Sequence, residues 1–234
     1  MLSAKDMIVI KKDKFVISYL NNCNLELTNK FIESMMLSFK DVHNFFNINY
    51  DNVEIILYTK EDFNKFIAKT TPEYGCEENI PNWLVGFSVD YKIHLVVPTE
   101  GTLEYMTKVA THEFVHYIAE QIPHTNYRVK LLDEGIACFL AHQMSDKTFQ
   151  TIVQDCTNNS LHSIMDFCIY DGNEFARLNG YAYSYVIMEF LIDKFGKEKI
   201  LYWLQNPDNF LNAINTLEED FKKFLTQKIN EKEN

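Results

Sequence analysis

The sequence predicts an α+β fold, in which an N-terminal mixed β-sheet lobe with helices is followed by an α-helical lobe. Before Thr99, short runs rich in β-branched and aromatic residues alternate with turn residues, a pattern typical of strands. From Thr99 onward, apolar residues recur every three or four positions, as in amphipathic helices. The chain has 234 residues, of which 47% are hydrophobic, so it is long enough to bury a sizeable core.

The first elements are a hairpin, a long helix, a strand and a short helix. Met7 to Ile10 and Phe15 to Tyr19 predict two strands around a Lys-Lys-Asp-Lys turn. Thr28 precedes a regular apolar stripe, so we expect it to cap a helix. Asn52 to Thr59 then predicts a buried strand, and Glu61 to Ala68 predicts a short helix.

A polar loop, Thr71 to Pro81, leads to two further predicted strands, Trp83 to Val89 and Lys92 to Val97. The rest of the chain predicts helices, at residues 102–121, 128–143, 146–156, 161–168, 178–195, 197–205 and 208–228. We therefore expect an N-terminal α/β lobe at 1–121 and a C-terminal helical lobe at 122–234. Together they are expected to form a single compact domain.

The composition argues against several classes of function. The formal net charge is −11, whereas nucleic-acid binding needs a positive surface, and an acidic surface also disfavours anionic membranes. The N-terminus has no apolar segment of the kind found in signal peptides, and no later run is long and uncharged enough to span a bilayer. Five cysteines without a C-x-x-C pair favour reduced thiols, so we expect a cytoplasmic protein. The oligomeric state cannot be read from the sequence.

The most informative motif is His112-Glu113-Phe114-Val115-His116, which has the form H-E-x-x-H. Residues four apart stack on one face of a helix, so His112 and His116 can bind the same metal ion. Glu113 projects about 100° around the helix axis and can reach a water molecule at that metal. The motif therefore predicts a zinc site with a general base beside it.

A catalytic zinc ion normally has three protein ligands, so one more is needed. The best candidate is Glu134, which lies 18 positions after His116 in Asp133-Glu134-Gly135-Ile136-Ala137. The turn containing Pro123 allows the second helix to fold back beside the first. Gly135 and Ala137 are small, and we expect them to let these two helices approach closely.

H-E-x-x-H followed by E-G-x-A resembles the gluzincin zinc metallopeptidases, the peptidase MA-like group that contains thermolysin and a family of aminopeptidases. A third segment, Asn179 to Tyr185 followed by Phe190-Leu191 and Phe195-Gly196, is similar to the tyrosine helix of these enzymes. Counting back from Leu191 and Gly196 with the spacing of the aminopeptidase pattern, the resemblance implies Tyr181, with Tyr185 as the alternative. Periodicity also places Tyr181 and Tyr185 on one inward face of this helix and Tyr183 away from it.

The resemblance implies a zincin-like active-site helix at the junction of the lobes and one zinc ion per chain, bound by His112, His116 and Glu134. It implies that Glu113 is the general base and that Tyr181 donates a hydrogen bond to the oxyanion. Asp133 is one candidate to orient a histidine ligand.

The resemblance also implies a peptide or protein substrate, which Gly86 and Phe87 on an edge strand could bind as an added strand. An ordinary strand without a binding role is an equally good interpretation of these two residues. The Gly-x-Met-Glu-Asn element that aminopeptidases use to bind a free amine is absent, which favours an endopeptidase. The alternative is a gluzincin-like binding or regulatory module that retains the metal but has little turnover.

Overall fold

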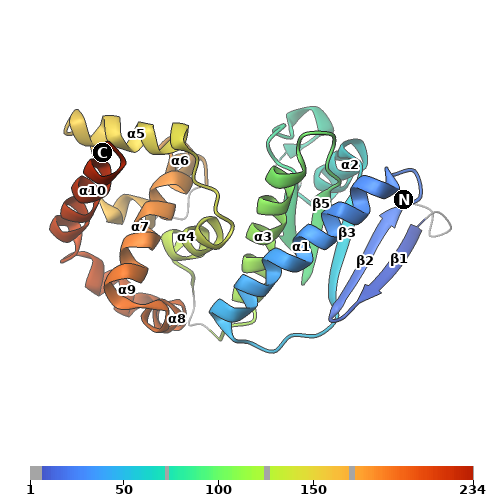
Figure 1. Cartoon of the computed structure of the whole chain (residues 1–234), viewed down its shortest axis with the longest axis horizontal. Helices are drawn as coiled ribbons and strands as arrows, with labels where there is room; N and C mark the ends of the chain where they lie inside the picture. The colour runs from blue at the N-terminus through green and yellow to red at the C-terminus, as the bar shows by residue number, and fades with distance from the viewer. Residues whose placement is uncertain (1–6, 72–73, 124–126, 169–171, 234) are drawn as a thin grey trace. The chain divides into compact units, whose positions relative to one another are not determined.

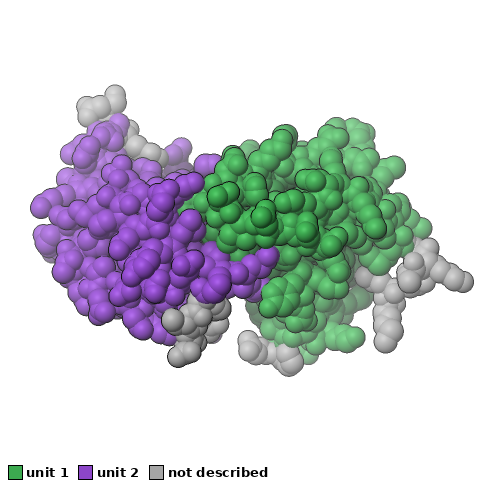
Figure 2. Space-filling view, turned by 90° about the horizontal axis from the view of Figure 1, so that it is seen from below, with its two compact units in different colours: residues 1–118 green, residues 119–234 purple. Residues whose placement is uncertain are grey.

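The computed structural model of the chain describes residues 7–71, 74–123, 127–168 and 172–233. Pro72 of the expected polar loop and the six N-terminal residues lie outside this part. The chain forms two compact units, residues 1–118 and 119–234, coloured separately in Figure 2. All of the strands in the described residues lie between Met7 and Val96, interrupted by two helices, and the described chain from Leu103 onward forms helices, so the predicted α+β class is confirmed.

The first unit is built on a five-stranded mixed sheet of order β1-β2-β3-β5-β4. Its strands are β1 (Met7–Lys12), β2 (Phe15–Leu20), β3 (Val53–Tyr58), β4 (Gly86–Val89) and β5 (Lys92–Val96). β1 and β2 form the predicted antiparallel hairpin, whereas β3 runs parallel to both β2 and β5. β4 is antiparallel to β5 and forms one edge of the sheet.

Two helices, α1 (Leu25–Phe46) and α3 (Leu103–Ala119), lie on one face of this sheet (Figure 1). Phe15 of β2 contacts Phe39 of α1 and Phe114 of α3, and the Phe39 and Phe114 rings stack with centroids 4.1 Å apart. The prediction that Thr28 caps α1 is wrong. The helix begins one turn earlier because the Asn24 side chain accepts a hydrogen bond from the Leu27 amide.

A shorter helix, α2 (Lys60–Thr70), packs against the opposite face of the sheet. Its Phe66 ring stacks on His94 of β5, with centroids 4.1 Å apart. His94 pairs with Ile56 in β3, and both alternate with the residues that face α1 and α3. The Tyr58 hydroxyl also lies 2.9 Å from His94 Nδ1. Ring stacking and this polar contact therefore account for the buried imidazole.

The edge strand β4 is shorter than expected. The pattern predicted a strand at Trp83 to Val89, but β4 begins at Gly86. The Leu84 amide instead donates to the Pro81 carbonyl in a turn, and the Lys60 ammonium binds the Leu84 carbonyl at 2.6 Å. A turn stabilised by a proline and a charged partner therefore replaces the first part of the expected strand.

The second unit is helical, and α7 (Gly180–Phe195) is its central helix (Figure 1). The helices that contact α7 are α4 (Lys130–Leu140), α5 (Asp146–Thr157), α6 (Gly172–Arg177), α8 (Lys197–Gln205) and α10 (Glu218–Glu233). α9 (Pro207–Ile214) contacts α8. Buried aromatic rings fill the interior: Phe149, Phe167, Phe175, Tyr183, Trp203, Phe210 and Phe221.

Three helix predictions in this unit need correction. The segment expected to be helical at 161–168 is a 3-10 helix, η4 (Ile164–Cys168). The single helix expected at 208–228 is two, because the chain turns after Ile214 and the Leu217 amide bonds the Ile214 carbonyl. α6 was not predicted. In the described part of the chain, no helix combines the length and apolar character needed to cross a membrane.

Candidate metal centre

The H-E-x-x-H residues lie in the C-terminal half of α3, as predicted. The His112 side chain is only 9% exposed, and its Nε2 atom lies 3.0 Å from the Nε2 atom of His116. The two ring centroids are 4.6 Å apart, with the planes nearly perpendicular. The four-residue spacing has therefore brought the two imidazoles together, with the Nε2 atoms of both rings close to each other.

This arrangement fits a zinc ion. Two nitrogens at zinc-binding distance in a tetrahedral site are about 3.3 Å apart, close to the separation observed in the structure. Imidazole is also one of the ligand types that zinc prefers. Among the described residues, His112, His116 and Glu134 form a group that could hold a metal ion, with one ligand atom from each lying within 4.8 Å of the others.

Contacts on the other side of α3 fix the helix in place. The Thr107 and Thr111 hydroxyls lie 3.1 and 2.8 Å from Ser34 Oγ and Ser38 Oγ of α1, respectively. Phe114 is fully buried against α1 and the sheet. Because Phe114 follows His112 by two positions, it projects to the other side of the helix. The packed face thus determines which way the two histidines point.

Glu113 lies against the edge strand at Gly86. A Cβ atom at position 86 would lie 2.9 Å from Glu113 Cγ, 3.2 Å from its Oε1 and 2.6 Å from Val109 Cγ1. These separations are shorter than the normal contact between carbon atoms. Gly86 therefore leaves the space that the Glu113 side chain occupies. Phe87 alternates with Gly86, and it pairs with His94 and so lies on the face covered by α2.

Glu134 lies in α4 and is 8% exposed. Lys130, one turn earlier, places its ammonium 3.0 Å from Glu134 Oε1. Sequence reasoning missed Lys130, although its i,i+4 spacing from Glu134 is the signal that could have found it. Asp133, the candidate to orient a histidine, lies 3.2 Å from the Arg128 guanidinium.

The expected purpose of Gly135 was wrong. We predicted that it lets α4 approach the H-E-x-x-H helix, but Gly135 faces α7. A Cβ atom there would lie 3.0 Å from the Ser184 carbonyl oxygen and 3.1 Å from Met188 Cε. The absence of a side chain at Gly135 therefore allows α4 and α7 to pack closely.

The tyrosines of α7 differ sharply in their surroundings. Tyr183, expected to point away from the inward face, is fully buried, and its hydroxyl donates to Asp155 at 2.7 Å. Tyr181 is 39% exposed, and its ring meets Phe175 edge-on at 5.1 Å. Tyr185 is half-buried, and burial raises its pKa. The periodicity failed because residues 182–184, 186–188, 190 and 191 are all buried, so apolar residues do not mark a single face.

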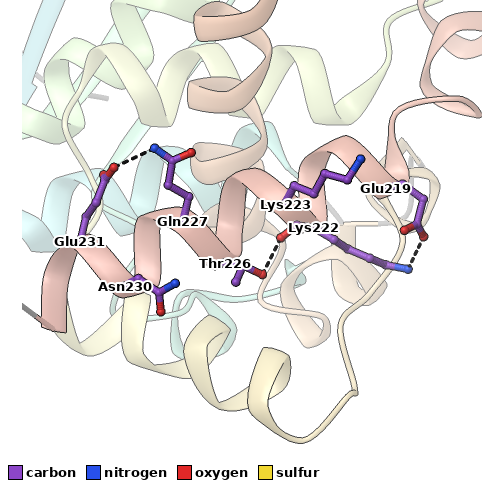
Figure 3. Close-up of a pocket in the computed structure, with 7 residues that line it drawn as sticks. All are labelled: Glu219, Lys222, Lys223, Thr226, Gln227, Asn230 and Glu231. Atoms are coloured by element: carbon purple, nitrogen blue, oxygen red, sulfur yellow. Dashed lines mark hydrogen bonds and ion pairs between the residues drawn. The ribbon is translucent and has the colours of Figure 1, made fainter.

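A pocket elsewhere in the second unit contains none of the predicted site residues (Figure 3). It is lined by one side of α10: Glu219, Lys222, Lys223, Thr226, Gln227, Asn230 and Glu231. Several of these residues bond one another, including Lys222 with Glu219 at 3.1 Å and Gln227 with Glu231 at 2.9 Å. This surface is a self-paired polar helix face, and we assign it no ligand.

Comparison with known proteins supports the metallopeptidase interpretation at the level of the family. No curated protein matches the sequence. A family model described as Peptidase MA superfamily matches residues 81–225, a segment that contains β4, the H-E-x-x-H motif, Glu134 and Tyr181. Because this segment covers more than half of the chain, the protein belongs to the Peptidase MA superfamily.

Proposed function

We propose that this protein is a zinc-dependent metallopeptidase that hydrolyses peptide bonds, with one zinc ion bound by His112, His116 and Glu134. The observation that carries this proposal is that the three residues forming one potential metal group lie in H-E-x-x-H and E-G-x-A motifs within the family match. Two imidazoles and one carboxylate leave a fourth zinc position for water or substrate. When bound, zinc supplies Lewis acidity, which makes water a better nucleophile and the scissile carbonyl more electrophilic.

Glu113 is the proposed general base. In this role its carboxylate accepts a proton from the attacking water, whose oxygen bonds to the carbonyl carbon. Glu113 then gives this proton to the leaving amine as the carbon–nitrogen bond breaks. The close fit of Glu113 against Gly86 supports the role, because it restricts the carboxylate on a rigid helix.

Tyr181 is the proposed oxyanion donor. Its phenol is the most exposed of the three on α7, whereas the Tyr183 hydroxyl is already committed to Asp155. The edge-on contact with Phe175 restrains the Tyr181 ring. Tyr185 remains the alternative donor. Loss of one such donor typically raises the barrier by about 2.7–4 kcal/mol.

The proposed substrate is an extended peptide that pairs with β4, because this strand is an edge of the sheet and is adjacent to Glu113. The backbone of Gly86 would lie beside the bound peptide near Glu113, whereas the Phe87 side chain projects from the opposite face of the sheet. An endopeptidase is favoured because no Gly-x-Met-Glu-Asn element is present to bind a terminal amine. All five cysteines are free thiols, which supports a cytoplasmic location.

A cleavage assay tests the proposal. Zinc-loaded wild-type protein is incubated with a diverse peptide mixture, with Glu113→Gln as the matched variant, and new termini are identified by mass spectrometry. We expect cleavage in wild type and at least about a hundredfold less in Glu113→Gln, because the amide cannot accept the proton. Glu113→Gln should still bind zinc. Zinc binding without cleavage by either protein would refute the proposed peptidase activity and favour the alternative, a gluzincin-like binding or regulatory module.

A further inference from the structure

Lys130 and Glu134 form an ion pair within α4. The Lys130 Nζ atom lies 3.0 Å from Glu134 Oε1, and the two side chains are only 19% and 10% exposed. A pair this well shielded from water is screened much less than a surface pair. It therefore has a larger electrostatic effect on the carboxylate than most i,i+4 pairs have.

A buried aromatic ring provides a second contact for the lysine. Lys130 Nζ lies 5.2 Å from the centroid of the Phe175 ring, within the range of a cation–π interaction. Phe175 is 1% exposed and is held in place by α7: a Cβ atom at Gly180 would lie 2.6 Å from the Phe175 carbonyl oxygen. The ammonium group is thus held between a carboxylate and a fixed ring.

We propose that Lys130 is the counter-ion of the metal-free site: it neutralises Glu134 when no metal is bound and competes with the metal for this carboxylate. The inference rests on the proposed function, in which Glu134 is a zinc ligand. A buried carboxylate needs a positive partner, which either an ammonium or a metal ion can provide. When zinc binds Glu134, the Lys130 charge remains close and opposes the second cation.

The proposal predicts two effects of opposite sign when the lysine charge is removed. The metal-free protein becomes less stable because Glu134 loses its ion pair with Lys130. Zinc binds more tightly because a repelling charge is gone and the carboxylate has become a stronger ligand. A lysine that merely supports the local fold would lower stability and weaken zinc binding together.

The test measures two quantities in the full-length protein: the zinc dissociation constant, by competition with a chromogenic chelator, and the midpoint of thermal unfolding without metal. Lys130→Met is compared with Lys228→Met. Lys228 is a matched control because it pairs with Glu189 at 2.6 Å in the same unit and lies 5.9 Å from the Phe224 ring centroid. Lys130→Gln removes the charge but keeps a hydrogen-bond donor, which provides a second variant if Lys130→Met does not fold.

We expect Lys130→Met and Lys130→Gln to bind zinc at least about tenfold more tightly than wild type. Their metal-free forms should unfold at lower temperature. Lys228→Met and the charge-conserving Lys130→Arg should keep the wild-type zinc affinity. Unchanged or weaker zinc binding in the Lys130 variants, or an equal gain in Lys228→Met, would overturn the inference. If wild type itself binds no zinc, the proposed function fails, which is a separate result.

Discussion

At the candidate site, Gly86 packs closely against Val109 and Glu113. Glycine is required there by space, because a methyl group would overlap Val109 and press on the Glu113 side chain. The contact joins the edge strand of the sheet to the proposed general base. A small change in the strand should therefore move the carboxylate without affecting the histidines directly.

Gly86→Ala is expected to lower the kcat of peptide cleavage by about tenfold to a hundredfold, since a displacement near 1 Å can have an effect of this size. Zinc content should stay at the wild-type level. Gly172→Ala is the control, because nothing lies within 4 Å of a Cβ atom at that position. Wild-type kcat in Gly86→Ala would show that the base tolerates the displacement.

His94 is the residue with the clearest predicted effect of pH on stability. Burial against Phe66 and Tyr58 lowers its pKa from 6.5 to about 4, and the Lys92 charge adds to the shift. The unfolded chain therefore takes up this proton before the folded protein does. The contribution of neutral His94 to the free energy of unfolding is complete above about pH 6.5. As the pH falls toward 4, this contribution is lost, which lowers the free energy of unfolding by up to about 3 kcal/mol.

The measurement is the free energy of unfolding in urea, without metal, between pH 7 and 4. His94→Gln retains a polar group that can form a hydrogen bond with the Tyr58 hydroxyl, but it cannot titrate. Its free energy of unfolding should fall less steeply than that of wild type across this range. Parallel curves for the two proteins would mean that His94 does not control the acid sensitivity.

At the scale of elements, helices and strands were predictable where apolar positions are clearly distinct from polar ones in the sequence, as in α1 and β3. Boundaries were less so, because they depend on single polar contacts such as the Asn24 cap or the Lys60 bond to Leu84. In α7 the pattern identified the helix but not its buried side, since most of its central residues are buried. The packing of Gly135 against α7 could not be predicted, because it is a tertiary contact and a local sequence pattern contains no such information.

Gly135→Ala tests the packing of α4 on α7. Alanine normally stabilises a helix interior relative to glycine by about 0.5–1 kcal/mol. Here the added methyl group would meet the Ser184 carbonyl and Met188, so we expect a loss of about 1–3 kcal/mol in the free energy of unfolding. Urea denaturation of Gly135→Ala measures this loss, with Gly172→Ala as the control. A more stable Gly135→Ala would contradict the packing.

At the scale of the whole molecule, the sequence predicted the five strands in their order along the chain, most of the helices, and the group of His112, His116 and Glu134 that could hold a metal ion. These residues could be found because His112, Glu113 and His116 share one helical turn and Glu134 has its own motif. Lys130 was missed although its i,i+4 spacing from Glu134 is visible in the sequence. The room that Gly86 leaves for Glu113 could not be found in this way, because it depends on side-chain distances that only the folded chain defines.

The most direct test of the account is the zinc content of purified protein after reconstitution and extensive dialysis. We expect about one zinc per wild-type chain and less than about 0.2 in His112→Ala and Glu134→Ala, because each removes one of three protein ligands. Glu189→Ala, which removes a different half-buried carboxylate of the second unit, should retain the metal. Wild-type protein with less than about 0.2 zinc per chain would contradict the central claim that these three side chains form a zinc site.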